Sequence, residues 1–198
     1  MTPATPEPVL STKGFEYERD ITQPIDILNG ASMNSLGQVE LYEGEQRIEP
    51  AEFQTTDTEQ PLPRYSVIDI GSSSDTQTRL RLGFTEIVIF DTQQVVLDKG
   101  ETSTMTSVTL NGEVMTRMRS LSPQVIQCGR TKTCDVQIAD RVKGASRVHM
   151  SAKVVTNGTK FVLLVQNTGS NGVFLMPNPQ PEATELPEAP NKTIALRI

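Results

Sequence analysis

The stretch H-M-S-A-K-V-V-T-N-G-T-K-F-V-L-L-V, residues 149–165, has the pattern of two antiparallel β-strands joined by a turn. Three apolar residues, Met150, Ala152 and Val154, occupy alternate positions. Because successive side chains of a strand point to opposite faces, these three would share one face. An Asn-Gly pair follows, and then the apolar run Phe161–Val165. The stretch predicts an antiparallel sheet with one face in a core.

Short runs rich in β-branched and aromatic residues recur on both sides of this stretch. They lie at Val39–Tyr42, Tyr65–Ile70, Glu86–Phe90, Val95–Leu97, Val108–Leu110, Val114–Met118, Val125–Gln127, Val136–Ile138, Val173–Leu175 and Thr193–Leu196. Asn111-Gly112 favours the positive φ angles of a type I′ turn, which predicts a hairpin. The polar residues Asp91–Gln94 are expected to form a four-residue hairpin loop. Many short strands without helical periodicity predict an all-β fold, either a sandwich or a barrel.

The chain divides by composition into three parts. Residues 1–24 are rich in Pro, Thr and Glu without periodicity and are expected to be disordered. Residues 25–79 form an acidic, partly ordered extension, which either wraps the following domain or stays loose. Residues 80–198 are expected to form an antiparallel β-sandwich. Its C-terminal edge is expected to be divergent, or to be completed by chain beyond Ile198, because the residues after Leu175 are Pro-rich.

Charge is distributed unevenly along the chain. Residues 1–103 contain 7 Lys and Arg against 18 Asp and Glu, whereas residues 104–198 contain 11 against 6. The basic half therefore suits an anionic partner or the acidic half of the chain itself. Its positive excess is too small and too scattered for direct nucleic-acid binding, which requires many phosphate contacts.

Metal, cofactor and membrane functions have little support in the sequence. Cys128 and Cys134 are the only cysteines and His149 is the only histidine, so ligands for a zinc site are too few. The N-terminus has no apolar segment of the signal-peptide kind, and the run Phe161–Val165 is too short to cross a bilayer. A soluble protein without metal, cofactor or membrane partner is expected.

Three short polar motifs lie between the expected strands. They are Gly129-Arg130, Ser146-Arg147-Val148-His149 and Ser170-Asn171-Gly172. Ser146 and His149 form the nearest pair for nucleophilic catalysis, but a triad also needs a third group and an oxyanion hole. The sequence contains neither paired carboxylates nor a phosphate-binding P-loop. No enzymatic activity and no catalytic residue are therefore expected.

The same motifs suit the binding of an anion. A guanidinium forks two charge-assisted hydrogen bonds to a phosphate, and hydroxyl and backbone N–H groups add further bonds. Each bond to a charged group contributes roughly 1.5–3 kcal/mol, so two or three separate a phosphorylated side chain from an unmodified one. Arg130, Ser146, Arg147 and Ser170 supply such donors, provided that their loops converge.

The order and spacing of the motifs resemble those of the forkhead-associated (FHA) domain family, whose pattern is Gly-Arg, Ser-x-x-His and then Asn-Gly. The resemblance covers residues 129–175 directly and implies a β-sandwich of about eleven strands that binds phosphothreonine peptides through loops at one end. The residues that it implies for binding are Arg130 and Ser146 for the phosphate, Ser170 for an added hydroxyl contact, Asn171 for the peptide backbone, and Arg147 for peptide or phosphate.

The resemblance also implies supporting and specificity residues. Gly129 would let its loop turn, His149 would brace the loop that bears Ser146, and Gly172 would complete the Asn-Gly pair. In the family, loop residues near the matched Ser select the residue three positions after the phosphothreonine. Arg141 and Lys143 are the candidates here, which predicts an acidic residue at that position. The chain departs from the family pattern at Asn167, Gly169 and Met176.

The function implied is the recruitment of phosphothreonine-containing proteins in nuclear signalling, in the cell cycle or the DNA-damage response, with a cytoplasmic location as the alternative. Thr22-Gln23, Thr76-Gln77 and Thr92-Gln93 suggest phosphorylation-dependent self-association. Two other functions stay open. One is a phosphate-independent assembly domain. The other is the regulatory front of a checkpoint-type or meiotic-type Ser/Thr kinase whose catalytic domain lies beyond Ile198.

Overall fold

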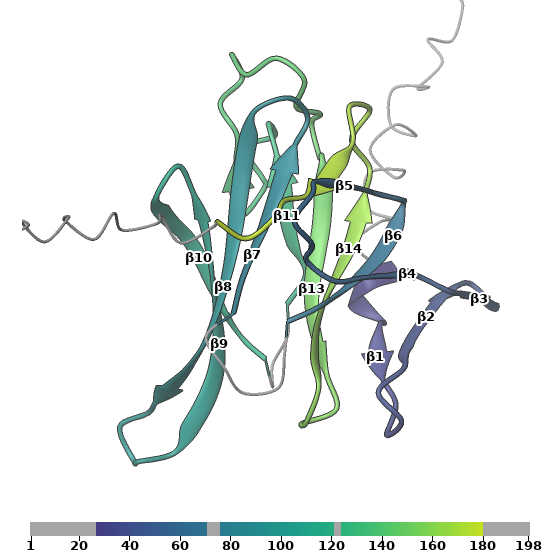
Figure 1. Ribbon diagram of the computed structural model, residues 1–198, viewed down its shortest axis with the longest axis vertical. Helices are drawn as coiled ribbons and strands as arrows, with labels where there is room; N and C mark the ends of the chain where they lie inside the picture. The colour runs from purple at the N-terminus through teal and green to yellow at the C-terminus, as the bar shows by residue number, and fades with distance from the viewer. Residues whose placement is uncertain (1–26, 71–75, 121–123, 180–198) are drawn as a thin grey trace, which may run out of the picture.

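Alternating apolar residues build two six-stranded sheets that pack face to face, with a small three-stranded sheet beside them (Figure 1). The computed structural model describes residues 27–70, 76–120 and 124–179. These residues are almost entirely β, and their only α-helical segment is one turn at residues 27–29. The predicted all-β sandwich is therefore confirmed.

Fifteen strands make up the three sheets. They are β1 (Ser32–Met33), β2 (Val39–Glu43), β3 (Gln46–Ile48), β4 (Ala51–Phe53), β5 (Gln60–Leu62), β6 (Tyr65–Asp69), β7 (Thr76–Leu82), β8 (Glu86–Val96), β9 (Thr102–Leu110), β10 (Glu113–Arg119), β11 (Ile126–Gly129), β12 (Val136–Gln137), β13 (Met150–Thr156), β14 (Phe161–Asn167) and β15 (Val173–Leu175). The small sheet has the order β1-β2-β3, and the large sheets have the orders β10-β9-β8-β7-β15-β5 and β12-β11-β13-β14-β6-β4. The two large sheets thus hold twelve strands, against the expected eleven or so.

A single core lies between the large sheets. Leu80 and Phe90 from one sheet belong to the same buried cluster as Met150, Ala152 and Leu163 from the other. The alternation in β13 fixes this arrangement, because it turns Met150 and Ala152 inward and Lys153 outward. The opening stretch forms the β13–β14 hairpin, with Thr156 paired to Phe161.

Three strands that precede residue 76, β4, β5 and β6, are part of the sandwich. β6 pairs with β14, and β5 pairs with β15, so each large sheet contains strands from the region expected as an acidic extension. The domain boundary expected near residue 80 lies inside β7. The β-branched run of β6 needs two neighbours, and the sheet supplies β14 on one side and β4 on the other. β5, which precedes β15 along the chain, pairs with β15 and forms the edge of that sheet.

Residues 27–48 cover the outer face of the sheet that contains β13 and β14. Leu28 and Leu41 are fully buried in a second cluster with Val155 and Leu164. Lys153 fixes the segment, because its Nζ donates hydrogen bonds of 2.8 Å to the carbonyls of both Asn29 and Ala31. Burial lowers the pKa of Lys153. Of the expected extension, residues 27–48 therefore wrap the sandwich, whereas β4, β5 and β6 are strands within it.

Of the two other predicted hairpins, one is confirmed and one is wrong. Asn111 and Gly112 have φ angles of 52° and 79° at the turn between β9 and β10, as a type I′ turn requires. Asp91–Gln94, in contrast, is not a loop but part of the continuous strand β8. Its polar character has a local reason, since the buried Thr92 hydroxyl bonds the Thr106 hydroxyl across the β8–β9 pair at 2.9 Å.

The burial of Thr92 also bears on phosphorylation. Only 4% of this residue is exposed, so its hydroxyl is not accessible to a kinase in the folded protein. Thr76 lies in β7, whereas Thr22 lies outside the described residues. The tail at residues 1–24 and the strand expected at Thr193–Leu196 also lie outside them.

The described part of the chain contains no helix with the length and apolar character needed to span a bilayer. The same residues contain no cluster of His, Cys, Asp and Glu that could hold a metal ion.

Candidate functional site

The three sequence motifs lie on loops at one end of the sandwich, which is the upper end in Figure 1. One motif ends β11, one precedes β13, and one joins β14 to β15. The turn that joins β13 to β14 lies at the opposite end, because β14 runs from Phe161 at that turn to Asn167 at the loops. We refer to the loops at 130–135, 138–149 and 168–172 as the motif loops.

Gly129 lies where two backbones cross. A Cβ atom at this position would be 2.1 Å from the carbonyl oxygen of Arg147 and 2.8 Å from the Cα of Val148. The close approach allows a ladder of backbone bonds, from Arg130 N to Ser146 O at 3.1 Å and from His149 N to Cys128 O at 2.8 Å. Gly129 is therefore required by close packing and not, as expected, by a turn, since it is not among the described residues with positive φ.

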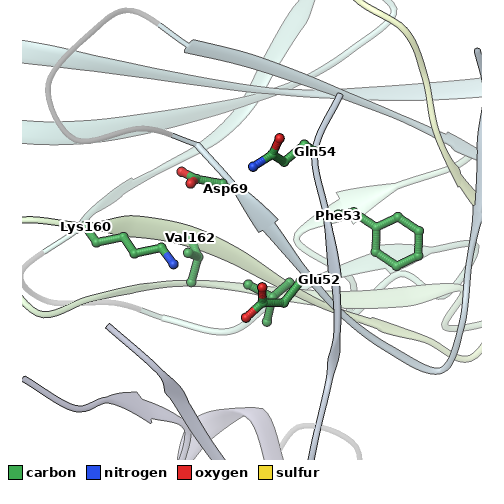
Figure 2. Close-up of a pocket in the computed structure, with 7 residues that line it drawn as sticks. Glu52, Phe53, Gln54, Asp69, Lys160 and Val162 are labelled. Carbon is green, nitrogen blue, oxygen red and sulfur yellow. The ribbon is translucent and has the colours of Figure 1, made fainter. Parts of the chain in front are cut away.

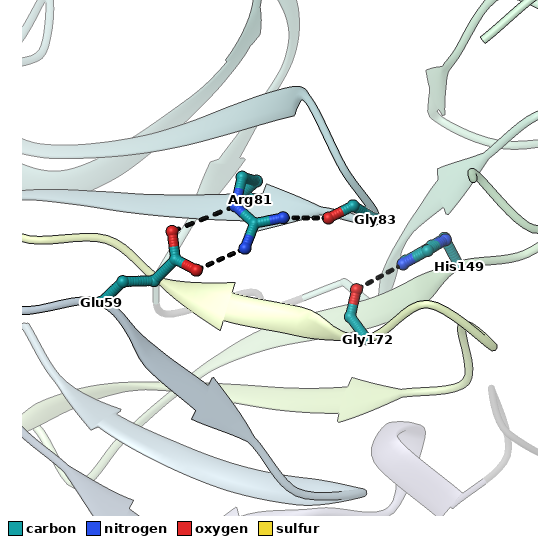
Figure 3. Close-up of polar contacts among 5 residues, drawn as sticks. All are labelled: Glu59, Arg81, Gly83, His149 and Gly172. Carbon is teal, nitrogen blue, oxygen red and sulfur yellow. Dashed lines mark hydrogen bonds and ion pairs between the residues drawn. The ribbon is translucent and has the colours of Figure 1, made fainter. Parts of the chain in front are cut away.

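His149 joins two of the motif loops through its ring (Figure 3). Its Nδ1 accepts a bond of 2.9 Å from the backbone N–H of Ser146, so the ring proton is on Nε2, which donates to the carbonyl of Gly172 at 2.7 Å. The ring is fully buried, and this burial lowers the pKa of His149 against the opposing effect of the Gly172 carbonyl. The imidazole is therefore a neutral link between loops.

Gly169 provides the space for that ring. A Cβ atom at position 169 would be 2.3 Å from Nε2 of His149. Sequence reasoning counted Gly169 only as a departure from the family pattern. The contact shows that a larger residue would displace His149 from both of its bonds.

Ser146, Ser170 and Arg130 come together at the exposed side of these loops. The Oγ of Ser146 accepts a 3.2 Å bond from the backbone N–H of Ser170, and the two hydroxyl oxygens are 3.4 Å apart. The half-buried Arg130 donates from Nε to the carbonyl of Ala145 at 2.6 Å, which anchors its guanidinium one residue before Ser146. The rest of the fork, Nη1 and Nη2, makes no bond to the described residues.

Asn171 connects the third motif to the loop before β13. Its Nδ2 donates to the carbonyl of Gly144 at 3.0 Å, while its side chain stays exposed. Gly144 has a φ of 92°, and a Cβ atom there would be 2.6 Å from the ring of Phe84. Phe84 is 63% exposed, so its ring forms an apolar surface beside Gly144.

A salt bridge between Arg81 and Glu59 lies beside β15, the strand that follows the loop at 168–172 (Figure 3). Arg81 binds both carboxylate oxygens of Glu59, and Arg81 also donates to the carbonyl of Gly83. The guanidinium carbon lies 4.1 Å from the ring centre of Phe174 on β15. Gly83 in turn donates its N–H to the Gly172 carbonyl at 3.0 Å, which ties this region to the site. Hydrogen bonding to Arg81 lowers the pKa of Glu59.

The remaining predicted residues lie around the site. Arg147 is exposed, and its carbonyl accepts bonds of 3.0 Å from both the backbone N–H and the Oγ1 of Thr131. Arg141 and Lys143 are exposed as well, and among the described residues neither has a hydrogen-bond or ion-pair partner. The structure therefore brings Arg130, Ser146, Ser170 and Asn171 together and leaves Arg147, Arg141 and Lys143 at the periphery.

Arg147 faces a depression that the sequence did not reveal. We call it the Gln127 pocket; it has a volume of about 550 Å³, and its walls include Gln127, Arg130, Lys132, Asp140 and Arg147. Gln127 was predicted only as the end of a strand, and Lys132 was not singled out. The alternation of Gln127 with the core residues Ile126 and Cys128 was the available signal that its side chain lies outside the core.

A different pocket lies at the far end of β14 (Figure 2). It has a volume of about 270 Å³, and its polar side chains are Glu52, Gln54, Asp69 and Lys160. Two carboxylates against one ammonium make this pocket unsuitable for a dianion, because like charges repel. The pocket is not part of the motif loops.

No protein-family model matches the sequence, and neither a curated protein nor a solved structure matches it significantly.

Proposed function

We propose that the motif loops bind phosphothreonine peptides, as the resemblance to FHA domains implies. The observation that carries the proposal is the convergence of Arg130, Ser146 and Ser170, which come from three separate loops. Arg130 is anchored at Ala145, and the hydroxyls of Ser146 and Ser170 lie 3.4 Å apart. A guanidinium fork with two adjacent hydroxyls is a donor set that suits a phosphate dianion.

The loops hold this donor set in place before a ligand arrives. His149 is bonded to Ser146 and Gly172, and Gly129 allows backbone bonds between Arg130 and Ser146. Such preorganisation reduces the entropy that binding would otherwise cost. Asn171 stands at the edge of the set with its amide beside Gly144, where it can reach the backbone of an extended peptide.

A titration of labelled peptides tests the proposal. A phosphothreonine peptide and its unmodified copy would be titrated into the wild-type chain, into Arg130→Ala and into Arg117→Ala, an exposed arginine on β10. Wild type and Arg117→Ala are expected to prefer the phosphorylated peptide, and Arg130→Ala to lose at least about tenfold in affinity, the equivalent of one charge-assisted bond.

Two results would contradict the proposal. One is equal affinity of the wild type for phosphorylated and unmodified peptide. The other is partner capture that persists after phosphatase treatment and in Arg130→Ala, which would indicate a phosphate-independent assembly domain. Recruitment of phosphorylated partners in nuclear signalling belongs to the proposal through the resemblance alone. An acidic preference set by Arg141 and Lys143 has the same basis, and alanine variants of both residues would test it on a peptide library.

A further inference from the structure

The Gln127 pocket adjoins the proposed phosphothreonine site through Arg130, which lines the pocket and also stands next to Ser146. Three cationic side chains, Arg130, Lys132 and Arg147, line the pocket against one carboxylate, Asp140. Even when Arg130 is assigned to the phosphothreonine, Lys132 and Arg147 leave the pocket with more positive than negative charge. An excess of this kind favours an anionic group.

The Gln127 side chain adds a donor that is independent of these charges. Gln127 is 9% exposed, and its Nε2 has no hydrogen-bond partner among the described residues. Its backbone is fixed, because its N–H donates to Oδ2 of Asp135 at 2.9 Å. A buried amide donor without a partner is unfavourable for the folded state, and a ligand oxygen would satisfy it.

The walls of the pocket are held at a defined separation. Thr131 bonds the Arg147 carbonyl twice, from its backbone N–H and from its Oγ1, at 3.0 Å each. Lys132 follows Thr131 directly, so these bonds keep Lys132 and Arg147 on neighbouring loops, with both side chains exposed. The two cations can thus approach one anion from two sides without a rearrangement of the backbone.

We propose that the Gln127 pocket is a second anion subsite. It takes a carboxylate or phosphoryl side chain of the same peptide whose phosphothreonine is bound by Arg130, Ser146 and Ser170. Lys132 and Arg147 neutralise the charge, and a rotation of the Gln127 side-chain amide brings its buried Nε2 to the anion as a hydrogen-bond donor. The subsite rests on the proposed function, because Arg130 links the two positions and places both anions on one peptide.

Peptides with one and two anionic residues test this subsite on the full chain. In the series, one phosphothreonine is fixed and a single Glu or phosphoserine is moved through the flanking positions, with Ala elsewhere. At one flanking position the second anion is expected to raise affinity about tenfold, the usual effect of one charge-assisted bond. A gain with Glu alone identifies a carboxylate, and a gain with phosphoserine alone identifies a second phosphate.

Lys132→Ala is expected to remove this gain while it changes the affinity for the singly phosphorylated peptide less than about twofold. Lys99→Ala is the matched control, since Lys99 is also an exposed loop lysine but lies between β8 and β9 and does not line the pocket. Gln127→Leu is expected to remove part of the gain without loss of thermal stability, because it deletes a buried donor that lacks a partner.

The outcomes separate the subsite from the proposed function. Equal affinity for all singly and doubly anionic peptides would overturn the subsite and leave phosphothreonine binding intact. Loss of the gain in Lys99→Ala but not in Lys132→Ala would also overturn it. Equal affinity for phosphothreonine and threonine peptides would overturn the proposed function. A gain that Lys132→Ala removes, Gln127→Leu reduces and Lys99→Ala leaves unchanged supports the subsite.

Discussion

The two Asn-Gly pairs at the ends of β14 have the same sequence and different roles. At Asn157-Gly158 the contacts are mostly local, since the Asn157 side-chain oxygen accepts bonds from the backbone N–H groups of Thr159 and Lys160. At Asn171-Gly172 the contacts are distant. Asn171 bonds the Gly144 carbonyl, and the Gly172 carbonyl accepts bonds from both His149 and Gly83.

The surroundings of the two glycines differ in the same way. Both have positive φ, 95° for Gly158 and 79° for Gly172. A Cβ atom at Gly158 would have no neighbour within 4 Å, whereas one at Gly172 would be 3.1 Å from the ring of Phe174. The comparison teaches that a turn dipeptide specifies only a local backbone conformation, and that the packing around it decides whether the turn also holds a site together.

The largest expected difference between the two ends of β14 is the loss of stability caused by an added methyl group. Gly169→Ala is expected to lower the free energy of unfolding by about 3 kcal/mol, because it forces a methyl group into the His149 ring. Gly158→Ala is expected to cost about 1 kcal/mol, which reflects only the positive φ. Urea denaturation of both variants measures these values. Equal losses would show that the motif loops are packed no more tightly than the open turn.

The next difference is a pH dependence of the free energy of unfolding, which arises only at the Asn171-Gly172 end of β14. Burial lowers the pKa of His149, so between its folded pKa and the unfolded value of about 6.5 the unfolded chain binds more protons. The free energy of unfolding is therefore expected to decrease as the pH falls from 7 to 5.5, with a slope of at most about 1.4 kcal/mol per pH unit.

His149→Gln provides the control for this titration. His149 is the only histidine, so the variant should be less stable at pH 7 but nearly independent of pH over the same range. Denaturant unfolding at several pH values measures both proteins. A wild-type slope equal to that of the variant would contradict a buried neutral imidazole.

The two asparagines are expected to separate binding from stability. Asn171→Ala should weaken binding of a phosphothreonine peptide about tenfold, because it removes the expected contact with the peptide backbone. Asn157→Ala should leave binding unchanged and lower the free energy of unfolding by about 1 kcal/mol, through loss of its turn bonds. Peptide titration and urea denaturation of each variant test this pair. The prediction fails if Asn171→Ala leaves peptide binding unchanged or if Asn157→Ala weakens it.

The smallest expected effect concerns the salt bridge next to Gly83. Glu59→Gln should lower the free energy of unfolding by about 0.5 kcal/mol, since the side chains of Arg81 and Glu59 are 19% and 35% exposed and water screens the pair. Glu49→Gln is the control, because Glu49 pairs with Arg47 at 3.0 Å in a more exposed position. Urea denaturation should resolve a loss for Glu59→Gln and none for Glu49→Gln.

Much of the fold could be predicted from the sequence, because strands and tight turns depend on local patterns. Alternation predicted β13, and Asn111-Gly112 predicted the β9–β10 hairpin. The prediction failed at Asp91–Gln94, where polar residues in a row suggested a loop. Thr92 satisfies its hydroxyl on Thr106 of the neighbouring strand, and a single strand's sequence does not show which partner it will have.

The candidate site was predictable from the sequence to a similar extent. Arg130, Ser146 and Asn171 were predicted from residue type and order, which fix the available donors. Gln127 and Lys132 were missed, since a pocket wall assembled from β11 and two loops has no contiguous sequence pattern. Gly129 was identified, but the reason for it was not, because close approach of Arg147 depends on the path of a second segment.

The sequence alone thus determined the strand periodicity, the positive φ of the Asn111-Gly112 turn and the supply of anion donors. These properties arise from neighbouring residues and need no distant partner. Only the tertiary structure decided that residues 51–69 contribute strands to both large sheets, that His149 links Ser146 to Gly172, and that one Asn-Gly pair lies among the motif loops while the other lies at the opposite end of β14. The physical reason is that hydrogen bonds and steric contacts between remote segments depend on the path of the whole chain.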